Sequence, residues 1–179
     1  MFVSGTRVSG SILLVLACAS CGPQPPFTVS QDGFGPITLG MPVVKAERLL
    51  GVHLEKDNYN DHDGCRYYTP VKGYRGLAFM TSLGKIVRVD VDESEDPKKP
   101  ALIATEEGAK IGDTEARVLA LYKGRIKVSP HFYGGLPSHY FRVYDGVGKV
   151  RLIFETDGKA VISYRAGREP EIEYVEGCQ

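Results

Sequence analysis

The feature that most restricts the fold of this chain is an internal repeat with a period of about 70 residues. The segment from Ile37 to Leu50 aligns with the segment from Ala109 to Tyr122 at an offset of 72 residues, the distance from Gly40 to Gly112. Both segments begin with a strand-like stretch, turn at that glycine and continue into an amphipathic helix. Two copies with this period indicate a duplicated unit and not a solenoid.

The second part of each half also matches, now at an offset of 74 residues, from Leu77 to Arg151. Each of these parts predicts a strand, a glycine turn and a second strand, and Asp157-Gly158 is a strong hairpin signal. Further strands are expected at residues 65–69 and 139–144. The predicted fold class is therefore α+β: a duplicated unit of one helix and about three antiparallel strands, two halves in one domain, with the helices on one face of the sheet.

The N-terminal twenty residues differ from the rest of the chain. Arg7 is their only charge, and an apolar run from Ser11 to Ala19 follows it, which is the pattern of an export signal. This run is shorter than the roughly 20 apolar residues that a membrane span needs; the alternative is a buried N-terminal strand. We expect a signal peptide at 1–20, a proline-rich tether at 21–34, a first repeat at 35–95, a charged linker at 96–108 and a second repeat at 109–179.

The stretch from Leu16 to Gly22 resembles a bacterial lipobox, in which a cysteine is lipidated and becomes the new N-terminus. Cleavage before Cys21 leaves Cys65 and Cys178 as an even pair for a disulfide, whereas cleavage before Cys18 leaves Cys21 as an odd thiol in an oxidising compartment. We therefore expect lipidation at Cys21 and an envelope protein on the periplasmic or surface side of the outer membrane. Cleavage after Ala19, giving a secreted protein, is the alternative.

The start of each half resembles a known domain family. Ile37, Gly40-Met41, Ala46 and Leu50-Gly51 are similar to the opening of the small outer-membrane assembly lipoprotein domain of SmpA/OmlA type. Two such units in tandem resemble the architecture of the β-lactamase inhibitory protein, and the resemblance covers roughly residues 35 to 175. It implies a non-enzymatic, protein-binding domain and supplies no catalytic residue.

The candidate ligand-binding residues are His131, Tyr133, His139 and Tyr140, which surround a glycine–proline loop. Exposed aromatic side chains in loops are typical recognition anchors for proteins. The same rings and imidazoles also suit stacking on a sugar. The alternative is that Phe132 and Tyr140 fill the core. Three tyrosines form the counterpart in the first half: Tyr67, Tyr68 and Tyr74.

Other chemistries find little support in the sequence. Lys plus Arg and Asp plus Glu each number 22, so no basic excess indicates nucleic acid. Setting Gly64 at position 6 of a calcium loop places Tyr59 at position 1 and Pro70 at position 12, which fails the ligand pattern. The acidic run that begins at Asp90 is interpreted as solvated. No zinc spacing, nucleophile motif or phosphate loop is present, so we expect no metal, cofactor or catalytic residue.

The resulting hypothesis is a membrane-anchored envelope lipoprotein that binds another envelope or secreted protein, as an inhibitor or an assembly accessory. A carbohydrate-binding module with a glycan partner is the second hypothesis, and an envelope hydrolase is the third.

The anchor leads to a direct prediction. Cys21→Ser should release the protein from membranes because it removes the acceptor of the lipid, whereas Cys18→Ser should leave the protein bound. Membrane fractionation of cells labelled with a fatty-acid probe measures both. If Cys21→Ser is still lipidated, the assignment of the anchor is wrong.

Overall fold

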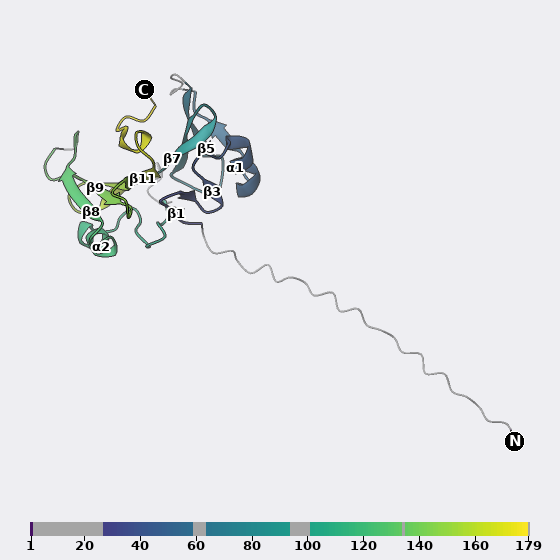
Figure 1. Ribbon diagram of the computed structural model, residues 1–179, viewed down its shortest axis with the longest axis horizontal. Helices are drawn as coiled ribbons and strands as arrows, with labels where there is room; N and C mark the ends of the chain where they lie inside the picture. The colour runs from purple at the N-terminus through teal and green to yellow at the C-terminus, as the bar shows by residue number, and fades with distance from the viewer. Residues whose placement is uncertain (2–26, 59–63, 94–100, 134, 179) are drawn as a thin grey trace.

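The computed structural model describes Met1 and residues 27–58, 64–93, 101–133 and 135–178. Within these residues the chain forms eleven β-strands, two α-helices and one short 3-10 helix (Figure 1). None of its described helices combines the length and the apolar character that crossing a membrane requires. Apart from Met1, the predicted signal peptide lies outside the described residues, as do both candidate lipidation residues, Cys18 and Cys21.

The centre of the structure is an eight-stranded antiparallel sheet with the order β4-β5-β6-β7-β11-β10-β9-β8. Its strands are β4 (Leu54–Lys56), β5 (Cys65–Pro70), β6 (Leu77–Ser82), β7 (Lys85–Asp92), β8 (Ile126–Pro130), β9 (His139–Tyr144), β10 (Val150–Thr156) and β11 (Val161–Gly167). Strands β4 to β7 form one half of the sheet and β8 to β11 the other. The last strands of the two sets, β7 and β11, pair with each other at the middle of the sheet, where Val89 lies opposite Ala166.

Each half is preceded by a short helix. Helix α1 (Val43–Leu50) follows Pro42 and ends at Gly51, whose φ of 65° is the left-handed conformation typical of a helix C-terminus. Helix α2 (Glu115–Leu121) begins at Thr114, whose side chain accepts a hydrogen bond from the backbone N–H of Arg117. Both helices lie in the two repeated segments where the sequence predicts a helix after the glycine turn.

The two faces of the sheet are different. The face toward the helices is apolar: side chains of β7, β10 and β11, among them Val89, Phe154 and Tyr164, join one core with buried residues of both helices. The opposite face carries the alternate, mostly polar side chains. The C-terminal strap (residues 168–178), which contains the 3-10 helix η1 (Glu171–Glu173), crosses this second face, as the yellow segment above the sheet in Figure 1.

The strap is held by apolar and polar contacts. Ile172 is fully buried against Tyr140, Val150 and Ile153. The Arg142 side chain donates hydrogen bonds to both carboxylate oxygens of Glu173, at 3.1 Å from Nε to Oε1 and 3.0 Å from Nη2 to Oε2. The disulfide between Cys65 and Cys178 fixes the strap's end to β5, as the cysteine pairing predicts.

The expected α+β class holds only in part, because the chain is mainly β. Each helix spans about two turns, and each half contributes four strands to the sheet instead of about three. The short strands β4 and β8 were not predicted from the sequence. Leu54-Glu55-Lys56 is too short to show a period, and β8 exposes three of its five residues on an edge.

The expected tether and linker both contribute to the folded structure. A small sheet joins β1 (Val29–Ser30) and β2 (Gly33–Phe34) of the predicted tether to β3 (Ile37–Thr38) of the first repeat, with Val29 and Phe34 in the core. In the predicted linker, Ala101, Ile103 and Thr105 are buried. They alternate with the less buried Leu102 and Ala104, which is the signal of an extended, half-buried segment.

The disulfide should be a large part of the stability. Replacing both Cys65 and Cys178 with serine should lower the free energy of unfolding by about 4 to 5 kcal/mol, because the bond closes a loop of more than 100 residues in the unfolded chain. Urea unfolding with and without reductant measures the loss. Reduced wild-type protein should match the double variant; equal stability of all forms would contradict the prediction.

Candidate functional site

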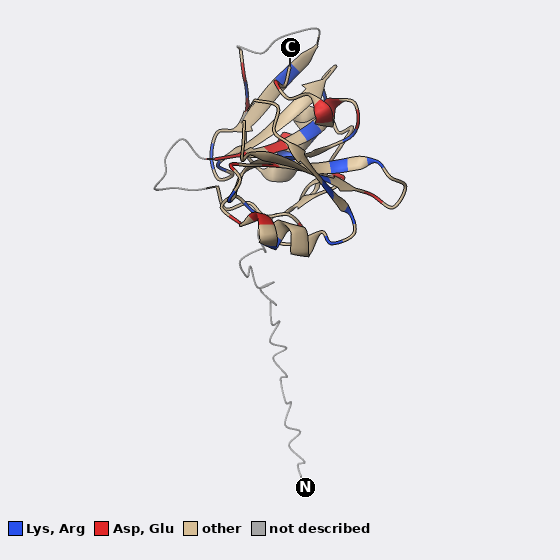
Figure 2. Cartoon of the chain, turned by 90° about the vertical axis from the view of Figure 1, so that its left-hand side faces the viewer, with Lys and Arg blue, Asp and Glu red and all other residues tan. Residues whose placement is uncertain are grey.

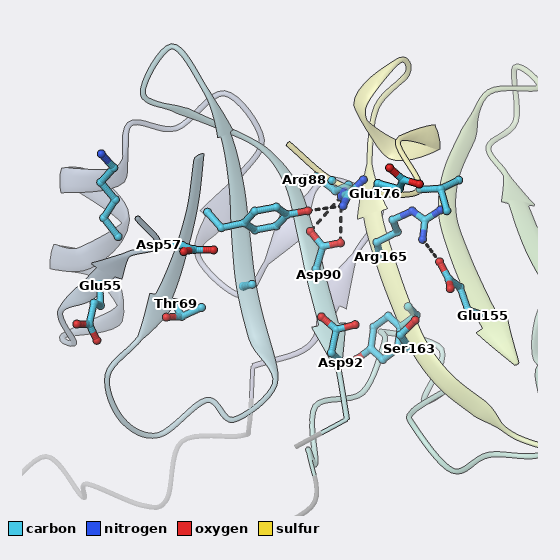
Figure 3. A pocket seen from close by; sticks show the side chains of 16 residues that line it. Glu55, Asp57, Thr69, Arg88, Asp90, Asp92, Glu155, Ser163, Arg165 and Glu176 are labelled. Atoms are coloured by element: carbon cyan, nitrogen blue, oxygen red, sulfur yellow. Dashed lines mark hydrogen bonds and ion pairs between the residues drawn. The ribbon is translucent and has the colours of Figure 1, made fainter. Parts of the chain in front are cut away.

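A polar pocket lies on the strap side of the sheet, at the junction of the two halves. Its volume is about 600 Å³. The floor comes from β4, β5, β6, β7 and β11, and one wall comes from Val175, Glu176 and Gly177 of the strap (Figure 3). The strand alternation explains its polarity: in β7, Val89 and Val91 face the core, so Arg88, Asp90 and Asp92 face the pocket.

Arg88 is the most connected side chain of this pocket. Its Nε donates to Asp90 at 3.0 Å, its Nη2 donates to the Tyr67 hydroxyl, and its Nη1 donates to the carbonyl oxygens of Glu171 at 2.8 Å and Tyr174 at 2.7 Å. Burial raises the pKa of the Asp90 carboxyl, although the Arg88 charge opposes that effect. Burial lowers the affinity of Arg88 for its proton, yet Asp90 and Tyr67 outweigh it, so the pKa of Arg88 is raised.

A second ion pair borders the pocket on the side of the C-terminal half. Arg165 of β11 pairs through Nη1 with Glu155 of β10, and its Nε donates to the Ile172 carbonyl at 2.7 Å. His131 Nε2 lies 2.8 Å from the other oxygen of Glu155. Burial opposes ionisation of Glu155, but His131 and Arg165 together hold its pKa below the ordinary value. Glu155 is therefore a charged carboxylate held between two partners.

Asp92 differs from these paired carboxylates. Its side chain is open to solvent in the pocket, and no hydrogen-bonding partner for it occurs among the described residues. Protein atoms around the pocket floor still remove part of its hydration, and Asp90 and Glu155 repel its charge. These effects, burial first, raise the pKa of Asp92 to about 6.

Acidic side chains outnumber basic ones around the pocket. The carboxylates are Glu55, Asp57, Asp90, Asp92, Glu155 and Glu176, and the cations are Lys56, Arg88 and Arg165. In the view of Figure 2 the two signs are interspersed over the described residues, in line with the balanced composition. The acidic excess is therefore a local property of the pocket.

The structure does not bring together all four residues that the sequence analysis proposes for ligand binding. His131 stacks on Tyr140 with 4.3 Å between ring centroids, and Tyr140 is only 3% exposed. Tyr133 is exposed, and its hydroxyl donates to Glu176 of the strap. His139 lies elsewhere, because its Nδ1 is 2.8 Å from Glu115 of α2, beside the opposite face of the sheet. Three of the four residues therefore surround the strap side, and His139 does not.

Sequence reasoning missed the pocket itself. The acidic run from Asp90 was interpreted as a solvated segment, although Asp90 and Asp92 alternate with Val89 and Val91 along a buried strand. That two-residue period of polar side chains was the available signal. Of the three tyrosines of the first half, Tyr67 lines the pocket, whereas Tyr68 and Tyr74 pack on the core.

Comparisons with known proteins do not extend this description: no protein-family model matches the chain, and no curated protein or solved structure is significantly similar to it. Within the described ranges, no group of three or more His, Cys, Asp or Glu side chains is placed to hold a metal ion. Among the described residues, the site thus offers paired charges, the unpaired carboxylates of Asp92 and Glu55, and hydrogen-bond donors for binding a ligand.

The raised pKa of Asp92 predicts a pH-dependent stability. A carboxyl whose folded pKa exceeds its unfolded value destabilises the fold once the pH is above about 6, and this contribution disappears below the unfolded pKa near 4. Asp92→Asn should therefore raise the urea midpoint at pH 7.5 and leave it nearly unchanged at pH 4. Glu93→Gln, at the next and exposed position, is the matched control. Equal effects of the two variants at pH 7.5 would contradict the assignment.

Proposed function

We propose that this chain is a lipid-anchored envelope protein that binds another protein with the strap side of its sheet. The observation that carries the proposal is an apolar tip, consisting of Phe132, Tyr133 and Leu136 in the connection between β8 and β9. These side chains are 76%, 60% and 91% exposed. Three large, exposed apolar side chains in one short connection form an apolar patch, and such a patch commonly marks an interaction site.

The apolar tip is next to further binding surface. Tyr133 reaches Glu176 of the strap, and the neighbouring strap residues Tyr174 and Val175 are themselves 44% and 39% exposed. Glu176 also lines the polar pocket. Aromatic anchors beside a polar, hydrogen-bonding region have the composition of a protein–protein interface.

The base of this connection is held in place before any partner binds. The backbone N–H of His131 donates to the Ser138 carbonyl at 2.9 Å, and the His131 ring is stacked on Tyr140 and bonded to Glu155. Ordering an interface segment on binding reduces affinity, so a fixed base favours tight binding.

The architecture supports the same class of function. The order of one helix and four strands occurs twice, as α1-β4-β5-β6-β7 and α2-β8-β9-β10-β11. We infer that the chain is a tandem of SmpA/OmlA-like units, similar to the β-lactamase inhibitory protein. That resemblance favours a non-enzymatic inhibitor or an assembly accessory. The disulfide favours an oxidising compartment, which fits export and a lipid at Cys21.

Carbohydrate binding is the second candidate. The exposed Tyr133 ring lies beside Glu176, and an aromatic face next to a carboxylate suits a sugar, which stacks on the ring and donates hydroxyl hydrogens to the acid. The protein-binding and carbohydrate-binding hypotheses therefore involve the same residues and differ in the ligand that these residues bind.

Affinity capture of envelope lysate with the full chain in detergent, followed by mass spectrometry and titration of the recovered protein, tests the proposal. Replacing Phe132 and Tyr133 with alanine should weaken the complex at least about tenfold, as expected for exposed aromatic anchors. Val147→Ala, a truncation of an equally exposed side chain in the turn between β9 and β10, should have no effect. Tyr140 is unsuitable for this test because its ring is buried under the strap.

Two outcomes would overturn protein binding. One is a glycan array with saturable binding that the Phe132/Tyr133 variant abolishes, together with no captured protein, which would support the carbohydrate hypothesis. The other is a captured protein whose affinity the double variant and the Val147→Ala control change equally.

A further inference from the structure

The polar pocket contains more negative charge than its own cations neutralise. Asp90 is paired with Arg88, and Glu155 is paired with Arg165. Asp92 has no such partner within the described part of the chain, and it is repelled by Asp90 and Glu155. Arg88 and Arg165 attract the Asp92 charge only from a distance, and the charge lies in a hollow open to solvent, so a cation of suitable length can form a direct ion pair there.

A second feature of the pocket also indicates a ligand. Arg165 is 5% exposed, and its guanidinium lies on the pocket wall between Glu155 and Glu176 (Figure 3). Its Nε and Nη1 are bonded, but its buried Nη2 has no acceptor among the described residues. A buried donor without a partner is costly, and it is uncommon in folded proteins. An oxygen acceptor that enters the pocket would satisfy it after a small shift of the guanidinium, because the atom itself is covered in the free protein.

We propose that this pocket binds a lysine or arginine side chain of the partner protein, with its cationic group beside Asp92 and a neighbouring main-chain carbonyl on Arg165. The inference rests on the proposed function and adds the chemistry of the partner's contact residue. A peptide segment carries both groups, a cation at the end of a long side chain and a carbonyl on the backbone.

The size and the charged walls of the pocket fit this ligand. About 600 Å³ is within the usual range of binding pockets for small molecules, and so it accommodates one long side chain with part of its backbone. The bonds that Arg88 makes to Asp90 and to two strap carbonyls leave it fixed as a wall. An acidic side chain is disfavoured, because it would approach Asp92 and the surrounding carboxylates.

Binding of a cation next to Asp92 has a measurable consequence. Asp90 and Arg88 on β7, Glu155 on β10 and Arg165 on β11 are the charged groups that act on Asp92. A bound ammonium or guanidinium adds one more positive charge and lowers the pKa of Asp92 from about 6. Binding at pH 6 should therefore release protons, whereas binding at pH 8 should release almost none.

The test uses the full chain in detergent and capped tripeptides with glycine on each side of lysine, arginine, norleucine or glutamate. Isothermal titration calorimetry in two buffers of different ionisation heat measures affinity and proton release. The lysine and arginine peptides should bind at least about tenfold more tightly than the norleucine peptide, since a charge-assisted contact is worth about 1.5 kcal/mol or more. The glutamate peptide should not bind.

Variants assign the effect to the pocket. Asp92→Asn should reduce lysine-peptide affinity about tenfold and abolish proton release at pH 6, and Glu55→Gln, also on the pocket rim, should reduce affinity less. Glu93→Gln, one residue beyond Asp92 and outside the pocket lining, should change neither quantity. Circular dichroism and urea unfolding confirm that each variant is folded.

The inference and the proposed function fail in different ways. Equal binding of the lysine and norleucine peptides, or binding unaffected by Asp92→Asn, would overturn the inference while a captured protein partner still supports the function. Spermidine that binds more tightly than every peptide would overturn a protein source of the cation. If the captured partner loses affinity with Phe132/Tyr133 replaced but not with Asp92→Asn, the apolar tip alone binds it and the pocket inference fails.

Discussion

Arg88 is the side chain on which the arrangement of the binding face depends. It projects from a central strand, and its guanidinium contacts one carboxylate, one phenol and two strap carbonyls. A buried guanidinium is unfavourable unless its N–H groups are satisfied, so Asp90 and the strap are needed to keep Arg88 in place. In return, Arg88 determines where the strap crosses the sheet. The pocket wall formed by Glu176 and the position of the disulfide both follow from that crossing.

This arrangement places three features within one surface: the disulfide-tethered strap, the polar pocket and the apolar tip. Glu176 connects all of them, because it belongs to the strap, lines the pocket and accepts a hydrogen bond from Tyr133. A ligand that binds there meets a charged hollow and an aromatic projection at the same time. Specificity then comes from requiring both a cation and an apolar contact, since a ligand with one of them leaves either Asp92 or the exposed rings without a partner.

Local sequence signals predicted much of the scaffold. The helices that follow the turns at Gly40 and Gly112 and the hairpin at Asp157-Gly158 depend on neighbouring residues, and each is present in the structure. Contacts between residues far apart in the sequence could not be predicted from such local signals. Whether Tyr140 is exposed depends on Ile172, more than thirty residues later, which covers it. Likewise the role of Asp92 depends on the pairing of β7 with β11, which brings Ser163 opposite it and Arg165 into the same pocket.

The electrostatics of Asp92 favour a functional over a structural explanation for the pocket. A carboxylate retained purely for the fold is expected to have a cationic partner that lowers its pKa, as Arg165 and His131 do for Glu155. Asp92 has the opposite property. The folded environment raises the free energy of its ionised carboxylate, so the folded state is destabilised while Asp92 is ionised. Groups destabilised in this way gather at functional sites, where a ligand supplies the missing interaction. On that reasoning the free protein is electrostatically incomplete at Asp92, and a bound cation supplies the ion pair that Arg88 gives to Asp90 and Arg165 gives to Glu155.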